Sequence, residues 1–237
     1  MAPGLPPKLH EYPDRATLAE GLAAGVAAVL AGGIATRGSA ILAVSGGSTP
    51  KLFLERLSQA TIEWARVTIC LVDERFVPDD HPRSNTRFLR EHLIRGPASE
   101  ARLELFFEPG LTAREAAERL SPRVSALPRP FDVAVLGMGT DGHTASFFPG
   151  ADRLAEALDL SARQAVIDIS APGADEPRLT LTLPMLADAR FLALHIEGQE
   201  KRAVLESAEA PGPIEALPVR AVLRLERAKP LNIFWAP

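Results

Sequence analysis

Short apolar runs recur along the chain, separated by segments that carry helix start and stop signals. The apolar runs predict strands at 38–47, 67–74, 131–137, 165–170, 190–198 and 231–237, with a short strand near 103–107 and an extended segment at 177–183. Runs that are apolar at nearly every position are typical of parallel strands, because helices cover both faces of such a sheet.

Helices are predicted between these strands, over 14–32, 51–59, 84–96, 112–121 and 199–209. Asp14 can cap the first helix, and Gly32-Gly33 would end it. Pro50 can open the second helix, where a missing N–H costs nothing. The first 14 residues are expected to be irregular, and the Pro-rich stretch 209–221 is expected to be a loop.

The alternation of strands and helices predicts an α/β fold built on a doubly wound, mostly parallel sheet with helices on both faces. A length of 237 residues suits one large α/β domain better than two small ones. Neither a repeat nor a low-complexity linker divides the chain, so we expect a single domain over residues 1–237.

Composition narrows the class of protein. A hydrophobic fraction of 46% and a charged fraction of 24% are those of a soluble globular protein. The net charge of -4, without a basic block, argues against nucleic-acid binding. We expect no membrane span, because no apolar run approaches the roughly 18 residues that one requires. The N-terminus does not resemble a signal peptide. The single cysteine, Cys70, lies in an apolar run and is expected in the core of a cytoplasmic protein.

The segment SGGSTP follows a predicted strand and precedes a helix. Gly46 and Gly47 let backbone N–H groups turn toward a ligand, while Ser48 and Thr49 add hydroxyl donors. This combination favours an anion, most often phosphate. The alternative is a tight turn with a capping hydroxyl, and the segment alone does not decide between the two.

The segment VDERFVP ends the next strand. Asp73 and Arg75 lie two residues apart on an extended chain and therefore point to the same side. Arg75 could bind phosphate, and Asp73 could orient a group or accept a proton. A solvated charge cluster after a strand is the alternative interpretation.

The most informative segment is GMGTDGHTASFFPG, at residues 137–150. A strand that runs into Gly137 and Gly139 brings backbone close to a ligand at the carboxyl edge of the sheet. His143 on such a loop can act as a general base near neutral pH. A structural turn with an exposed histidine is the alternative.

Two further cations follow predicted strands or begin elements. Arg178 starts the segment at 177–183, and Lys201 lies in the first turn of the helix at 199–209. Each is a candidate phosphate ligand or a solvated side chain. His195 is expected to be packed in its strand. The His and Cys residues do not occur at the spacing that zinc ligands have, so a zinc site is not expected.

Taken in order, SGGSTP, VDERFVP with the later SN, GMGTDGHTASFFPG and RLTLTLP resemble the 6-phosphogluconolactonase family over nearly the whole chain. The wider superfamily also contains glucosamine-6-phosphate deaminases. The resemblance implies a Rossmann-like fold and hydrolysis of a sugar-phosphate lactone without a metal or an organic cofactor. It also implies a small-molecule substrate, no nucleic-acid or membrane partner, and a monomer or small homo-oligomer.

The resemblance implies a role for each candidate residue. His143 would activate water, and Asp73 would lie beside it and help to place the water or the lactone. Asp141 would orient the loop or His143. The other candidates would bind the sugar phosphate: Gly46, Gly47, Ser48, Thr49, Arg75, Arg178 and Lys201.

Phe148 separates the two branches of the superfamily. The deaminases resemble DGHIAFNEPG here, with a glutamate where this chain has Phe148. A phenyl ring cannot carry the proton that sugar-ring opening requires. Two rival functions stay open: a deaminase or isomerase, which Phe148 argues against, and a non-catalytic sugar-phosphate sensor, which the presence of His143, Asp73 and Arg75 together argues against.

Overall fold

The computed structural model describes residues 4–172 and 174–237. Its centre is a seven-stranded sheet in which every strand pair is parallel. In spatial order the strands are β1 (Lys8–Glu11), β10 (Asn232–Ala236), β9 (Phe191–Glu197), β6 (Val133–Leu136), β2 (Ala40–Val44), β3 (Val67–Leu71) and β5 (Arg102–Glu104). The predicted α/β class with a mostly parallel sheet is confirmed.

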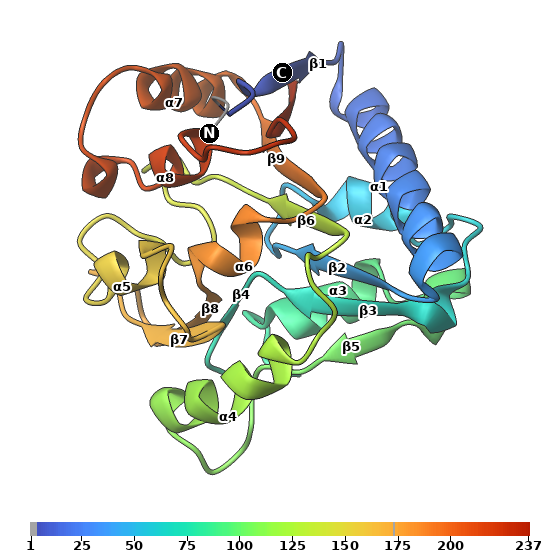
Figure 1. The fold of residues 1–237 in the computed structure, drawn as a ribbon, viewed down its shortest axis with the longest axis horizontal. Coiled ribbons are helices and arrows are strands. Elements are labelled where there is room, and N and C mark those ends of the chain that lie inside the picture. Colours follow the sequence, from blue (N-terminus) through green and yellow to red (C-terminus); the bar gives the residue numbers. More distant parts are fainter. Residues whose placement is uncertain (1–3, 173) are drawn as a thin grey trace.

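The helices lie on both faces of this sheet (Figure 1). They are α1 (Arg15–Arg37), α2 (Lys51–Leu57), α3 (Asn85–His92), α4 (Ala113–Ser125), α5 (Leu154–Leu158), α6 (Leu183–Ala187), α7 (Gln199–Glu209) and α8 (Val219–Leu223). The first two pack together against one face, whereas α6 lies over the other. Short 3-10 turns cover Trp64–Arg66, Gly96–Glu100 and Ile214–Ala216.

A second, antiparallel sheet contains β4 (Asp73–Arg75), β8 (Arg178–Leu181) and β7 (Val166–Ile169). The sequence predicts strands at 165–170 and 177–183 but not this separate sheet. Val72 joins the two sheets, since its N–H donates to Val44 and its carbonyl accepts from Leu181. The chain thus leaves the parallel sheet at Val72 and carries the next three residues into the smaller one.

Helix α1 is longer than predicted. It continues through Gly32 and Gly33 and ends at Gly38, whose φ of 80° supplies the left-handed cap. Gly33 packs closely, because a β-carbon there would lie 2.7 Å from Asp132 Oδ1. The glycine pair therefore serves packing inside the helix and does not terminate it.

The expectation that no segment is apolar enough for a membrane span is wrong for α1. This 23-residue helix reaches a mean hydropathy of 1.8, and 44% of that window is buried. Eight residues from Leu18 to Ile34 are buried, on the side that packs against α2, β2 and β10. Its composition is explained by this contact with the sheet.

Two segments, residues 8–11 and 209–221, contain structure that the sequence pattern does not predict. Residues 8–11 form the edge strand β1, which pairs in parallel with β10. The stretch 209–221, expected to be a loop, contains a 3-10 turn and the start of α8. The sequence of β1, KLHE, has only one apolar residue, so its strand conformation depends on a partner more than 220 residues away.

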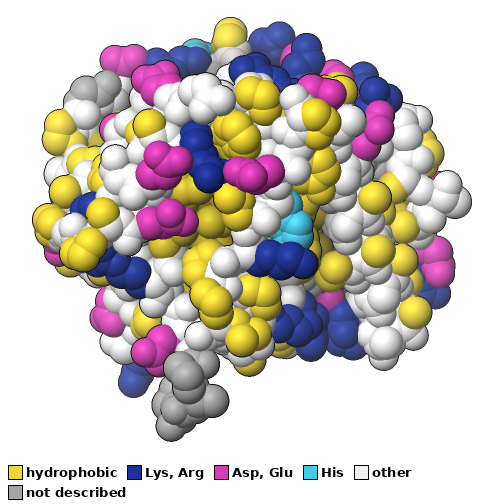
Figure 2. Space-filling view, turned by 90° about the horizontal axis from the view of Figure 1, so that it is seen from above, with side chains coloured by type: hydrophobic (Ala, Val, Ile, Leu, Met, Phe, Trp, Pro, Cys, Tyr) yellow, Lys and Arg dark blue, Asp and Glu magenta, His cyan; other side chains and the backbone are white. Residues whose placement is uncertain are grey.

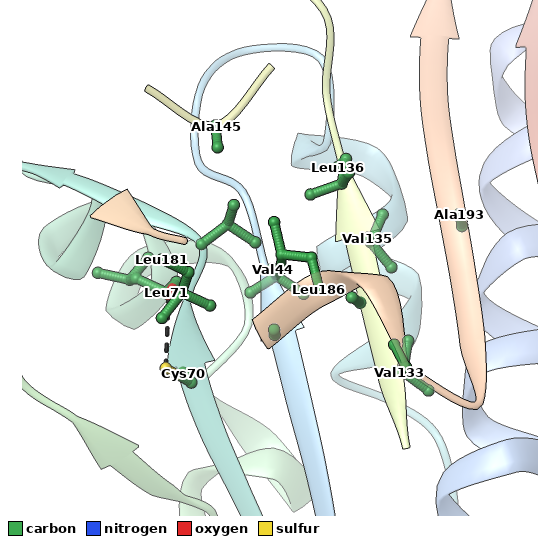
Figure 3. Packing of buried hydrophobic residues seen from close by; sticks show 14 of the residues in the cluster. Val44, Cys70, Leu71, Val133, Val135, Leu136, Ala145, Leu181, Leu186 and Ala193 are labelled. Carbon is green, nitrogen blue, oxygen red and sulfur yellow. Dashed lines mark hydrogen bonds between the residues drawn. The ribbon is translucent and has the colours of Figure 1, made fainter. Parts of the chain in front are cut away.

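The core lies between the sheet and its two layers of helices. Figure 3 shows Leu181 and Leu186 close to Val44, Leu71 and Leu136 of the central strands. Cys70 is completely buried, as predicted, and burial raises the pKa of its thiol well above the ordinary value. This packed core fixes the strand ends that carry the candidate residues.

Candidate active site

A cavity of about 210 Å³ opens at the carboxyl ends of β2, β3 and β6. Figure 2 shows a histidine beside Lys and Arg side chains near the middle of one face. The chain runs outward from β2 to β3 in one direction and from β6 to β9 in the other, so the cavity lies where the strand order reverses. Open α/β sheets bind ligands at such a point.

Nine of the ten predicted site residues line this cavity: Gly46, Gly47, Ser48, Thr49, Asp73, Arg75, His143, Arg178 and Lys201. The tenth, Asp141, is not among the lining residues. Their elements are far apart in the sequence, from the turn after β2 to the first turn of α7. The structure therefore brings five separately predicted segments together.

The turn between β2 and α2 forms one wall. Gly47 has a φ of 96°, which favours glycine, and a β-carbon at Gly46 would collide with the Asn85 side-chain oxygen. Thr49 accepts a hydrogen bond of 2.9 Å from Lys201 Nζ. Burial lowers the pKa of Lys201, which is consistent with an ammonium held against the turn and away from bulk water.

His143 is paired with Asp141. Its Nδ1 lies 2.6 Å from Asp141 Oδ1, and the same oxygen accepts the backbone N–H of His143 at 3.1 Å. The hydrogen bond from His143 lowers the pKa of Asp141, so this carboxylate is ionised and can only accept. Nδ1 therefore carries the hydrogen, and Nε2 is the nitrogen left to take a proton.

The His143 ring is confined on other sides as well. A β-carbon at Gly139 would collide with the imidazole, so only glycine leaves room for the ring in this position. Phe148 stacks on the ring with centroids 4.1 Å apart and an interplanar angle of 28°. Side chain and backbone contacts together fix the direction of the imidazole.

Asp73 is held by two polar partners. Its Oδ2 accepts a 2.6 Å hydrogen bond from Ser146 Oγ and lies 3.7 Å from Arg178 Nη1. Asp73 and His143 line the same cavity, and the position of Asp73 beside His143 stays a prediction. Within the described residues no hydrogen bond joins these two, and Asp141 is the carboxylate that holds the imidazole. Asp73 is directed to Ser146 because β4 leaves the parallel sheet to pair with β8.

Arg75 and Arg178 lie side by side, as cross-strand partners in β4 and β8. The Nε atoms of both are buried and have no hydrogen-bond partner in the described part of the chain. Burial lowers the pKa of Arg178, and Arg75 adds to the effect, whereas Asp73 opposes it. Two neighbouring guanidinium groups with unused donors favour a multiply charged anion.

Glu74 was not predicted as part of the site, although it lies between two predicted residues. Its carboxylate is 1% exposed and accepts hydrogen bonds from Ser84 Oγ and from the backbone N–H groups of Arg75, Asn85 and Thr86. Burial raises its pKa, and these donors oppose the rise. Glu74 thereby joins β4 to the start of α3.

The sequence of the whole chain matches a known family. A family described as glucosamine-6-phosphate isomerases/6-phosphogluconolactonase matches residues 13–234. The chain belongs to this family. The resemblance inferred from the motifs is confirmed, and the match includes every candidate residue.

Named relatives in this family are similar over nearly their full lengths. A 6-phosphogluconolactonase from Rhizobium meliloti (strain 1021) is 52% identical, with 97% of this chain and 98% of the relative covered. One from Pseudomonas aeruginosa is 43% identical, with coverage of 97% and 94%. The crystal structure of a 6-phosphogluconolactonase from Shewanella baltica OS155 has a TM-score of 0.94 at 36% identity and covers both chains completely.

A structure described as a monomeric glucosamine-6-phosphate deaminase shares the fold. Its TM-score is 0.72 at 18% identity, with 97% of each chain covered. At this identity the likeness concerns the fold alone. The two branches of the family must therefore be distinguished by side chains in the site.

Two residues that sequence reasoning missed contact Asp73 at this cavity. Ser146 is completely buried and fixes Asp73, whereas Asn85 lines the cavity and donates from Nδ2 to the Asp73 carbonyl at 2.9 Å. The family motif already contains both residues, within TASFF and the later SN. Their roles depend on contacts with Asp73 that sequence spacing cannot reveal.

Proposed function

We propose that the protein hydrolyses 6-phospho-D-glucono-1,5-lactone to 6-phosphogluconate, a step of the oxidative pentose phosphate pathway. One observation carries the proposal: a histidine fixed with Nε2 free lines the same cavity as three cations. The names of the relatives support the same reaction.

The imidazole of His143 acts as the general base. Its Nε2 takes a proton from water, and the hydroxide adds to C1 of the lactone. Asp141 keeps the hydrogen on Nδ1 and stabilises the imidazolium that forms. The imidazolium then gives its proton to the ring oxygen as the C1–O bond breaks. A general base of this kind contributes about 10²- to 10⁴-fold to the rate.

The tetrahedral oxyanion requires hydrogen-bond donors. Backbone N–H groups of the glycine-rich loops at 46–49 and 137–139 are the proposed source, since both loops contribute to the cavity wall. Asp73 helps to place the water or the lactone from the wall formed by β4. No step of this scheme requires a metal or an organic cofactor.

The phosphate is bound by Arg75, Arg178 and Lys201, and the turn from Gly46 to Thr49 closes around the sugar phosphate. Three cations against the single carboxylate Asp73 leave an excess of positive charge in the cavity wall. A phosphate dianion neutralises this positive charge, and its binding far from the reacting carbon positions the lactone.

The proposal covers residues 1–237 as one cytoplasmic domain that acts on a small molecule, as a monomer or small homo-oligomer, without nucleic-acid or membrane partners. The experiment generates the lactone in situ and follows acid release with and without the protein. Acid release at the uncatalysed rate with purified, folded protein would refute the proposal.

The deaminase alternative is tested separately. Deamination requires a proton carrier at the position where the deaminases have a glutamate, and this chain has the apolar ring of Phe148 there, stacked on His143. We expect no ammonia from glucosamine 6-phosphate between about pH 6 and 9, where a histidine base operates. A coupled ammonia assay at high enzyme concentration is the measurement. Turnover comparable with the lactone reaction would favour the deaminase.

A further inference from the structure

Phe148 contacts two residues that line the cavity, although it is not itself a lining residue. Its ring stacks on the His143 imidazole, with centroids 4.1 Å apart. The Arg178 guanidinium carbon lies over the same ring, 4.9 Å from its centroid. One aromatic side chain thus touches the proposed base and a proposed phosphate ligand.

The contact with His143 supplies a constraint that Asp141 does not. The hydrogen bond to Asp141 fixes one nitrogen, and the imidazole can still tilt about that bond. A flat ring stacked at 28° limits this tilt. Because Nε2 lies across the imidazole from Nδ1, a small tilt displaces it from the attacking water.

The contact with Arg178 holds a cation without using its donors. Arg178 is 9% exposed, its Nε has no partner in the described residues, and its ion pair with Asp73 is long, at 3.7 Å. An aromatic face attracts the guanidinium through its quadrupole and leaves the N–H groups free. The ring therefore holds the arginine in the cavity wall without occupying any of its N–H groups.

We propose that Phe148 is a positioning residue that aligns His143 for proton transfer and Arg178 for phosphate binding at the same time. The inference rests on the proposed function. It explains why an aromatic residue, and not merely an apolar one, suits this position: only a flat ring offers faces to both partners.

The test compares Phe148→Leu, which removes the flat ring, with Phe148→Tyr, which keeps it. Phe147→Leu is the matched control, because Phe147 is the neighbouring, completely buried core residue. Each variant is assayed on 6-phosphogluconolactone and on unphosphorylated gluconolactone. Calorimetry measures the binding of 6-phosphogluconate.

We expect Phe148→Leu to lower kcat on the unphosphorylated lactone about tenfold, through His143 alone. The ratio of kcat/KM for the phosphorylated over the unphosphorylated lactone should fall about fivefold, through Arg178, with a similar loss of affinity for 6-phosphogluconate. Phe148→Tyr should stay within about twofold of wild type in each quantity. Phe147→Leu should lower Tm and leave the ratio unchanged, as a purely structural effect would.

Variants that lack Arg178 show whether Phe148 affects the ratio through this arginine. In Arg178→Ala protein, Phe148→Leu should cause no further loss in the ratio, since the partner is already absent. Wild-type kcat and an unchanged ratio in folded Phe148→Leu protein would overturn the inference. If wild type hydrolysed neither lactone, the proposed function would fail. The binding measurement would then decide the inference: unchanged affinity in Phe148→Leu overturns it, and the expected loss supports it.

Discussion

At the scale of the residue, the decisive contact is the hydrogen bond between His143 and Asp141. The two are separated by one residue, so the loop conformation alone can bring them together. A carboxylate on Nδ1 determines which nitrogen of the imidazole is basic toward water. Two predictions test this pair.

The first prediction concerns the imidazole. His143→Ala should lower kcat by about 10²-fold or more, because the proton acceptor is lost. The side chain is partly exposed and lies outside the core, so the fold should survive. Circular dichroism and Tm verify folding, and initial rates of acid release give kcat. Wild-type turnover by the folded variant would remove His143 from the mechanism.

The second prediction concerns Asp141 and pH. Its pKa is lower in the folded protein than in the unfolded chain, so its contribution to stability is present above about pH 4, the ordinary pKa of aspartate, and disappears as pH falls through the folded value. Asp141→Asn should therefore lower Tm slightly near neutral pH, and the difference should shrink as pH falls below about 4. Thermal melts of both proteins across this range are the measurement. A Tm difference that grows toward acid pH would contradict the sign.

At the scale of the element, α1 contains two adjacent glycines in different surroundings. Gly32 has open space where a β-carbon would point, whereas Gly33 faces the buried carboxylate of Asp132. That carboxylate also accepts hydrogen bonds from Arg37 and from the backbone of Ile41, so it cannot move freely. The same substitution at the two positions should therefore have opposite effects.

The third prediction follows from this difference. Gly32→Ala should stabilise the protein by about 0.5–1 kcal/mol, because alanine loses less conformational entropy in a helix. Gly33→Ala should destabilise it, since its β-carbon would lie 2.7 Å from Asp132 Oδ1. Urea unfolding of the two variants and wild type measures both changes. Equal shifts in the two variants would contradict this account of the glycine pair.

At the scale of the whole molecule, the cations of the cavity come from three separate elements. Arg75 lies on β4, Arg178 on β8 and Lys201 on α7. Only the combination of the parallel sheet with the smaller antiparallel sheet brings them to one cavity. The proposed preference for a phosphorylated substrate thus depends on the whole fold and not on one element.

The fourth prediction tests this convergence. Wild type should prefer 6-phosphogluconolactone over gluconolactone by at least about 10²-fold in kcat/KM, since charge-assisted contacts contribute roughly 1.5–3 kcal/mol each. Arg75→Ala should reduce this preference. Arg114→Ala is the matched control, because Arg114 is exposed and lies on a helix outside the cavity. This variant should leave the preference unchanged. Equal kcat/KM for the two lactones in wild type would exclude a phosphate site.

Local sequence determined the strands of the parallel sheet from 38 onward, most helices, and the loops that carry the candidate residues. Apolar runs, caps and glycine turns act over a few residues, so they can be recognised without the fold. The order of the motifs also determined the family. The motifs also identified the candidate residues, nine of which line one cavity.

The tertiary structure decided what depends on distant partners. Strand β1 exists because β10 lies beside it, and β8 lies outside the main sheet because it pairs with β4 on one side and β7 on the other. Asp73 contacts Ser146 and Arg178, which come from distant parts of the chain. The Asp73–Ser146 contact, the β4–β8 pair and the β1–β10 pair join residues about 70 to more than 220 positions apart, and no local pattern encodes such contacts.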